Sequence, residues 1–319
     1  MIDASKTGPV GSLAVDAEAL RGHVERLAGD IGERNVFRPR ALAEAADYIE
    51  ATWRSQGYDV TRQGYEARGV RCANLEATRR GEGRPDEILL LGAHYDTVMG
   101  CPGANDNGSG VAALLELSRL LAAAAPAVTV RFVAFVNEEP PFFMTGEQGS
   151  TVYARAARER GDDIRLMVSL ETIGYYSEIP GSQRYPPLFG LFYPDRGNFL
   201  GFVSDFRSRK VMRRAAGIFR ARSDFPLEHV ATFGFVPGVT WSDHRSFWRQ
   251  GYRAFMVTDT APYRYPYYHS PGDTPDRLSY PELTRVTEGL YRTFDHMTRH
   301  GQHGARGPVS EDEAAPVPD

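Results

Sequence analysis

The chain has 319 residues, of which 42% are hydrophobic and 24% are charged, the composition of a globular protein that can bury a substantial core. Its 37 basic and 41 acidic residues give a formal net charge of −4, which argues against a general nucleic-acid-binding protein. No apolar run approaches the ~20 residues that cross a bilayer, and its only cysteines, Cys72 and Cys101, cannot form a disulfide framework or a structural zinc site.

Both ends of the chain differ in composition from the part between them. Residues 1–13 and 301–319 are polar and rich in small residues and proline, so we expect loose termini there. Residues 14–300 contain no linker-like break, which predicts a single domain. The first residues lack the apolar core of a signal peptide. This predicts a cytoplasmic protein, or a secreted one if a leader has been removed.

Helical and strand patterns alternate along the first half of the chain. Apolar residues recur at helical spacing over 14–27 and 40–56, and strand-like stretches follow at 58–65 and 72–78. The run ILLL at 88–91 is short and continuously apolar, which indicates a buried strand. Helical spacing returns at 111–121.

The second half continues the alternation. Strands are predicted at 129–136, 165–170 and 252–258, and helices at 148–158 and 281–300. Residues 176–206 are rich in glycine, proline and aromatic residues and show no clean period. Alternating strands and helices predict an α/β fold, a three-layer sandwich in which helices flank a mostly parallel, mixed central sheet.

Polar side chains of the types that bind metals follow the ends of these predicted strands. Ligand sites in open α/β sheets lie beyond the carboxyl ends of the strands. The residues at those positions are His94, Asp96, Asp106, Glu138, Glu139, Glu171 and His269. Imidazole and carboxylate groups of this kind fit a site for two divalent metal ions, most readily zinc.

Some of these residues have simpler explanations. At the period of a strand, His94 and Asp96 point the same way, so Asp96 can accept the second N–H of the imidazole. Asp106 could serve only as a helix cap, but the segment GANDNGSG has more turn-forming residues than a cap needs. Glu171 and His269 are weak signals on their own, because a strand-end glutamate is often an exposed charge.

The two adjacent glutamates present a different question. In a continuing strand Glu138 and Glu139 would point to opposite faces of the sheet. Two prolines follow them directly and stop the strand, so the chain must turn and both carboxylates can reach one cleft.

Other catalytic motifs do not occur. The sequence has no HExxH, GxSxG or GxxxxGK[ST] motif. The triplet Ser242-Asp243-His244 looks like a catalytic triad, but adjacent residues cannot stack as nucleophile, base and orienting group. We interpret the triplet as the start of a helix capped by Ser242, and support of the metal ligands is the alternative.

Several segments together resemble a known family. GAHYDTV, GANDNGSGVAALLEL, NEEPPFF, SLETIGYY, WSDHRSFW and YPYYHSPGDT occur in the order seen in the co-catalytic di-zinc aminopeptidases. That superfamily includes bacterial leucyl-type aminopeptidases, glutamate carboxypeptidase and glutaminyl cyclases. The resemblance extends from about residue 20 to residue 300 and implies the zinc-exopeptidase fold.

The resemblance also implies a role for each candidate residue. One zinc ion would be bound by His94 and Glu171, the other by Glu139 and His269, and Asp106 would bridge the two. Many family members have aspartate where this chain has Glu171. The remaining implied roles are a general base at Glu138, a partner for His94 at Asp96, and a cis peptide bond after Asp106.

The expected function is a metal-dependent exopeptidase, an aminopeptidase that acts on peptides or small amides with two zinc ions, for which ions such as Co²⁺ could substitute. The alternatives are a glutaminyl cyclase or another amide hydrolase on the same fold, and a non-catalytic binding module. Four tyrosines near His269 can line a substrate pocket or belong to the core: Tyr263, Tyr265, Tyr267 and Tyr268.

Overall fold

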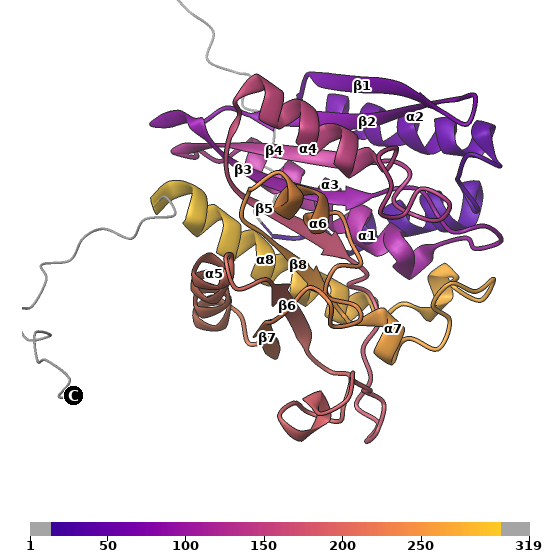
Figure 1. The fold of residues 1–319 in the computed structure, drawn as a ribbon, viewed down its shortest axis with the longest axis vertical. Helices are drawn as coiled ribbons and strands as arrows, with labels where there is room; N and C mark the ends of the chain where they lie inside the picture. Colours follow the sequence, from indigo (N-terminus) through magenta and orange to yellow (C-terminus); the bar gives the residue numbers. More distant parts are fainter. Residues whose placement is uncertain (1–13, 301–319) are drawn as a thin grey trace, which may run out of the picture.

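The computed structural model describes residues 14–300, so the expected loose ends at 1–13 and 301–319 lie outside the described residues. Its centre is a mixed sheet (Figure 1). The strands are β1 (Val60–Ala67), β2 (Val70–Arg79), β3 (Arg84–His94), β4 (Val128–Phe135), β5 (Asp163–Glu171), β6 (Leu200–Ser204), β7 (Leu227–Ala231) and β8 (Ala254–Thr258). Their order across the sheet is β1-β2-β4-β3-β5-β8-β6-β7.

The middle of the sheet is parallel. β3 pairs in parallel with β4 and β5, and β5 pairs in parallel with β8. Antiparallel pairs join β1 to β2, β2 to β4, and β6 to β8, while the edge strand β7 runs parallel to β6. The carboxyl ends of β4, β3, β5 and β8 therefore meet at one edge of the sheet.

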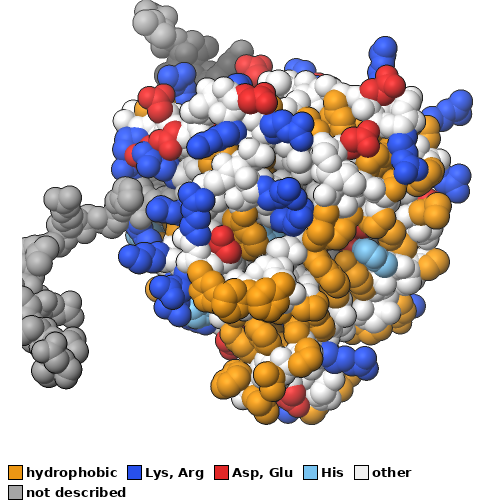
Figure 2. Space-filling model, in the orientation of Figure 1, with side chains coloured by type: hydrophobic (Ala, Val, Ile, Leu, Met, Phe, Trp, Pro, Cys, Tyr) orange, Lys and Arg blue, Asp and Glu red, His pale blue; other side chains and the backbone are white. Residues whose placement is uncertain are grey.

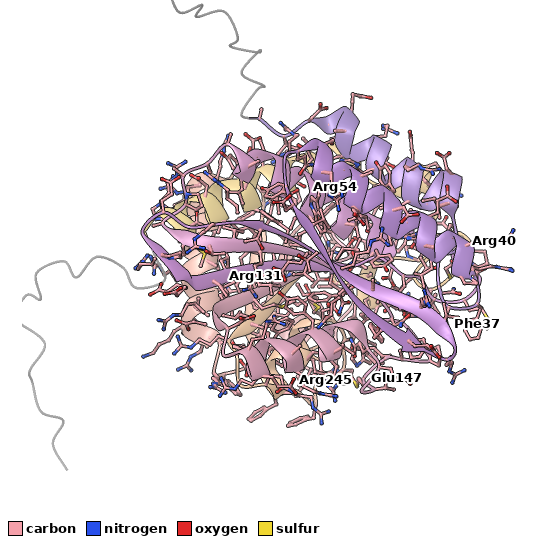
Figure 3. All side chains as sticks on the ribbon, turned by 90° about the horizontal axis from the view of Figure 1, so that it is seen from above. Phe37, Arg40, Arg54, Arg131, Glu147 and Arg245 are labelled. Carbon is pink, nitrogen blue, oxygen red and sulfur yellow. The ribbon has the colours of Figure 1, made fainter. Side chains whose placement is uncertain are left out.

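Helices cover both faces. The α-helices are α1 (Ala17–Val24), α2 (Pro39–Ser55), α3 (Gly110–Ala122), α4 (Gly149–Arg160), α5 (Arg209–Arg222), α6 (His244–Arg249), α7 (Ala261–Arg264) and α8 (Tyr280–His300). The remaining helical elements are η1 (Glu25–Ile31), η2 (Ala104–Ser109), η3 (Phe189–Leu191) and η4 (Pro275–Arg277). One core joins α1, α2, α3, α5 and α8 to the sheet, and α4 and α6 pack on the other face. Seen from above, Arg54 of α2 and Arg245 of α6 lie on opposite sides of the strands (Figure 3).

The alternation of side chains along β3 explains why its sequence is continuously apolar. Leu89 and Leu91 belong to the core under α3 and α8, whereas Ile88 and Leu90 belong to the core under α4 and α6. A strand covered on both faces has no polar face. The three-layer α/β architecture predicted from the sequence is confirmed.

The sequence pattern missed α5, β6, β7 and the short helix α7. No element was predicted between residues 207 and 240, where the structure has α5 and β7, and β6 lies in the segment without a clean period. The first predicted helix also ends differently, because α1 continues into the π-helical turn η1 up to Ile31. Within residues 14–300, no helix combines the length and the apolar character needed to cross a membrane.

Candidate functional site

Asp106 lies at the centre of the site, in the turn η2 that precedes α3. Its Oδ1 is 3.2 Å from Nε2 of His94, and its Oδ2 is 3.1 Å from Nε2 of His269. The peptide bond from Asp106 to Asn107 is cis, as the resemblance implied. The side chain does not cap α3, which begins at Gly110 without a side-chain cap. Asp106 therefore faces both histidines with its two oxygens.

A second carboxylate accompanies each histidine. Oε2 of Glu171 lies 3.4 Å from Nε2 of His94, and Oε1 of Glu139 lies 3.3 Å from Nε2 of His269. Ligand atoms about 2.1 Å from a tetrahedral metal ion such as zinc are about 3.4 Å apart. Each histidine thus lies against Asp106 and one further carboxylate, and ligand atoms of His94, Asp106 and Glu139 lie within 4.8 Å of one another, close enough to hold a metal ion.

Burial makes a positive charge at this centre necessary. Asp106, Glu138 and Glu139 are buried, and within residues 14–300 one oxygen of each has no hydrogen-bond partner. Buried carboxylates need a paired charge or a metal ion. His269 is the exposed member, with 33% of its side chain accessible, so the centre opens to solvent on its side.

The pKa values of the two histidines also show that the site favours positive charge. Burial alone would lower the pKa of His94, but Glu171 and Asp106 outweigh burial and raise it well above its usual value. For His269, the adjacent carboxylates of Asp106 and Glu139 likewise outweigh burial and raise the pKa to about 10. The carboxylates stabilise positive charge at both ring nitrogens, which a proton or a metal ion can supply.

Asp96 holds the two glutamates in place. Its carboxylate is 3.7 Å from Nδ1 of His94, and its backbone carbonyl is nearer to that nitrogen, at 3.2 Å. The carboxylate accepts the backbone N–H of Glu138 at 3.0 Å and that of Glu139 at 3.1 Å. The Asp96 carboxylate lies too far from Nδ1 for the hydrogen bond that the sequence predicted, and its hydrogen bonds instead fix the chain after β4.

Glu138 and Glu139 both reach the centre, because the chain leaves the sheet after β4. Asn137 has a φ of 59°, and the prolines that follow the glutamates prevent further strand pairing. Burial, together with the charges of Glu139 and Glu171, raises the pKa of Glu138 well above its usual value. Glu138 is therefore a carboxyl group that readily takes up a proton.

Glu171 is buried at the end of β5 and does not face solvent. The hydroxyl of Ser242 donates a hydrogen bond of 2.8 Å to its Oε2. A helix does start where the triplet predicted it, since α6 begins at His244, but no side chain caps it. The interpretation of Ser242 as a cap is therefore wrong, and its hydroxyl supports Glu171 as the alternative proposed.

Asp273 is a supporting residue that the sequence reasoning missed. It accepts the backbone N–H of Asn105 at 2.8 Å and of Asp106 at 3.0 Å, and the hydroxyl of Tyr265 at 2.8 Å. These bonds tie the turn that carries Asp106 to the segment that carries His269. The available signal was the motif HSPGDT, in which Asp273 follows His269 closely.

A large cavity lies next to the centre. It is open to solvent and is bordered by Glu171 and Tyr268 on the side of the candidate ligands. Tyr263 also lines it, whereas Tyr265 is buried against Asp273 and packs edge-on against Tyr267. Of the four tyrosines that could line a pocket or belong to the core, Tyr263 and Tyr268 line the cavity, and Tyr265 and Tyr267 pack against each other.

The chain is similar to known proteins in sequence. Residues 74–293 match peptidase family M28. The chain is 39% identical over 282 residues to the uncharacterized protein YfbL of Escherichia coli, covering 86% of each. It is 36% identical over 166 residues to an aminopeptidase of Pseudomonas aeruginosa, covering 51% of this chain and 27% of that protein.

Solved structures share the fold. A zinc aminopeptidase from Bacillus subtilis superposes with a TM-score of 0.71 at 15% identity, covering 90% of this chain and 96% of that one. The glutaminyl cyclase of Fimbriiglobus ruber gives a TM-score of 0.65 at 21% identity, covering 88% and 95%. The family resemblance inferred from the ordered motifs is confirmed, and the chain belongs to peptidase family M28.

Proposed function

We propose that the protein is a zinc-dependent aminopeptidase that removes N-terminal residues from peptides with two zinc ions. The observation that carries this proposal is the pair of His and carboxylate groups that share Asp106. Two relatives have names consistent with it: an aminopeptidase of Pseudomonas aeruginosa and a "probable zinc metalloprotease" of Pyricularia oryzae.

The donor atoms fit zinc, which prefers imidazole nitrogen and carboxylate oxygen at about 2.0–2.2 Å. His94 and Glu171 would hold one ion, His269 and Glu139 the other, and Asp106 both. Bound ions would supply two effects, a lowered pKa of the attacking water and polarisation of the scissile carbonyl.

Glu138 is the group proposed to move the proton. Its buried carboxyl has an oxygen without a hydrogen-bond partner and a raised pKa, so it can accept a proton from water as the new C–O bond forms. The same proton then passes to the leaving amine as the C–N bond breaks. Proton transfer by a positioned side chain contributes about 10²–10⁴-fold to rate.

The charge of the site favours a substrate with a free N-terminus. The centre gathers five carboxylates, those of Asp96, Asp106, Glu138, Glu139 and Glu171. Two divalent ions would supply four positive charges, so with Glu138 ionised one negative charge remains to attract an α-ammonium group.

A substrate panel tests the proposal. Zinc-loaded protein is expected to hydrolyse aminoacyl anilides, to lose this activity with a chelator, and to ignore N-acetylated analogues because they lack the ammonium group. A peptide with N-terminal glutamine belongs in the panel. Cyclisation of that glutamine without anilide hydrolysis would contradict the proposal in favour of a glutaminyl cyclase. Binding without any turnover would indicate a binding module.

A further inference from the structure

The cavity beside the metal centre has a floor made of sheet and a cover made of loops. Its floor is the face of β8, β6 and β7 that carries Thr258, Gly201 and Glu228. Two irregular segments, residues 183–199 and 236–241, line it from above. In Figure 2, hydrophobic side chains gather over the lower part of the molecule, where the first of these segments lies in Figure 1. The residues that line the cavity are themselves largely apolar.

Glu228 points into this cavity. On β7 its neighbour His229 faces the opposite side of the sheet, where its Nδ1 is 3.2 Å from a guanidinium nitrogen of Arg220 in α5. Successive side chains of a strand alternate between faces, so Glu228 lies on the cavity side. Within residues 14–300 its carboxylate has no hydrogen-bond or ion-pair partner in the structure.

Aromatic rings line the same cavity as this carboxylate. Tyr193 and Phe189 are stacked at 6.3 Å, and Tyr185 lies 5.9 Å from Tyr193. The hydroxyl of Tyr193 donates to the backbone carbonyl of His229, which holds the cluster over β7. Burial and the negative charge of Glu228 both raise the pKa of Tyr193. A charge on an edge strand usually faces solvent, but Glu228 is half-buried and lines the cavity together with these rings.

The register of the sheet gives the distance from the metal centre. Glu171 pairs with Thr258, Thr258 with Gly201, and Gly201 with Glu228. These residues form one row across four strands on one face of the sheet. Three strand spacings of about 4.8 Å place Glu228 about 14 Å from Glu171. An α-ammonium group held at the metal centre is too far away to reach Glu228.

A long basic side chain matches these features. The stems of lysine and arginine lie along apolar surfaces while their charged ends seek polar partners. Aromatic faces attract cations, and a carboxylate forms strong charge-assisted hydrogen bonds with them. The branched side chain of leucine ends well short of Glu228 and leaves this carboxylate without a partner.

We propose that the cavity binds the side chain of the substrate's N-terminal residue and that Glu228 selects lysine and arginine at this position. The inference rests on the proposed aminopeptidase function and adds the class of substrate to it. Glu228 acts as a specificity-determining residue at the far end of the cavity, whereas the metal centre acts on the peptide bond.

Anilides of lysine, arginine, norleucine and leucine test this inference with zinc-loaded protein. Norleucine is the decisive comparison, because it has the unbranched stem of lysine without the charge. We expect the wild type to have a higher kcat/KM for lysine than for norleucine, and Glu228→Gln to lower this ratio about ten- to hundredfold. Glu228→Lys should lower it further. Glu66→Gln is the matched control, since it removes the same charge from β1 at the opposite edge of the sheet.

The outcomes separate the two proposals. A wild type that prefers norleucine, or an unchanged ratio in Glu228→Gln, would overturn the assignment of Glu228 while hydrolysis itself still supports an aminopeptidase. If Glu66→Gln loses the preference for lysine as strongly, the preference comes from the overall charge of the protein, and the assignment is overturned as well. If no anilide is hydrolysed, the proposed function fails, and the inference fails with it.

Discussion

Glu138 and Glu139 are neighbours in the chain, but their carboxylates have different surroundings. Glu139 lies 3.3 Å from His269, whereas Glu138 has no ion-pair partner among the described residues. Asp96 holds the backbone of both, so the difference comes from the direction of the side chains. This separation is the structural basis for assigning one glutamate to the proton and the other to the metal.

Substituting each glutamate separately tests this division. Glu138→Gln keeps the shape of the side chain and removes its capacity to accept a proton, so kcat should fall about 10²–10⁴-fold with zinc content unchanged. Glu139→Gln should lower the zinc content as well. Turnover of anilides and zinc analysis of the same samples check both expectations. Normal turnover by Glu138→Gln would show that another group moves the proton.

The hydrogen bond from Ser242 to Glu171 leads to a second prediction. Groups that orient a metal ligand typically contribute 10–100-fold to metal affinity. We expect Ser242→Ala to weaken zinc binding by about this factor, measured by competition with a chelator of known affinity. Ser118→Ala is the control, because Ser118 is a buried serine that bonds Trp53 and Gln56 within another part of the core. Equal zinc affinities in the two variants would contradict the support of Glu171 by Ser242.

At the residue scale, the positions of the main candidate ligands at strand ends were enough to predict that they lie close together. His94, Glu139 and Glu171 each follow a parallel strand, and parallel strands end at a common edge. The hydrogen bonds of Ser242 and Asp273 could not be predicted in this way. They depend on the conformation of irregular segments, which no hydrophobic period encodes.

At the scale of elements, the segment between β3 and η2 is held by one buried side chain. Arg34 is fully buried, and burial lowers its pKa to about 10, so it stays charged at neutral pH. Its guanidinium donates to the backbone carbonyls of Leu27, Gly32, Tyr95, Pro102 and Gly103. This side chain therefore joins η1 to the segment that separates His94 from Asp106.

Arg34→Lys should consequently destabilise the protein. Lysine has three donors where arginine has five, so at least two of these carbonyls lose their partner. An unsatisfied buried acceptor costs about 1–3 kcal/mol, and we expect a loss of about 2 kcal/mol or more in the free energy of unfolding. Urea denaturation measures it. Arg40→Lys, on the exposed surface of α2 (Figure 3), should stay within about 0.5 kcal/mol of the wild type. An equally small effect of Arg34→Lys would show that the hydrogen bonds of Arg34 do not hold these segments together.

The two strands that the sequence did not predict were missed because they are short. β6 and β7 have only five residues each, too few for a clear period, and β7 is also the edge strand and is incompletely buried. α5 is different, because Val211, Ala215 and Phe219 form a helical stripe that could have been recognised. The long central strands and the helices that cover them have stronger periods, and these were predicted correctly.

At the scale of the whole molecule, the metal centre links segments that are distant in sequence. Asp106 belongs to the turn before α3, Glu171 to β5, and His269 to the segment after α7. Without cations, the carboxylates of these segments repel one another in a buried site. Zinc binding to the folded state should therefore stabilise the whole sheet edge.

Thermal unfolding measures this link. A ligand at 1,000 times its Kd stabilises the folded state by about 4 kcal/mol. We expect a chelator to lower Tm by several degrees and added zinc to restore it, while Asp106→Ala should show little response to either. A Tm that does not respond to chelation in the wild type would indicate that the centre binds no metal tightly.

The most direct test of the two-metal centre is the zinc content of the purified chain. Protein equilibrated with zinc and freed of excess metal should contain close to two zinc ions per chain by mass spectrometry. His269→Ala should retain about one, since His94 and Glu171 lie on the other side of Asp106. A wild-type chain that contains one zinc ion or none, or that hydrolyses anilides fully without metal, would contradict the account.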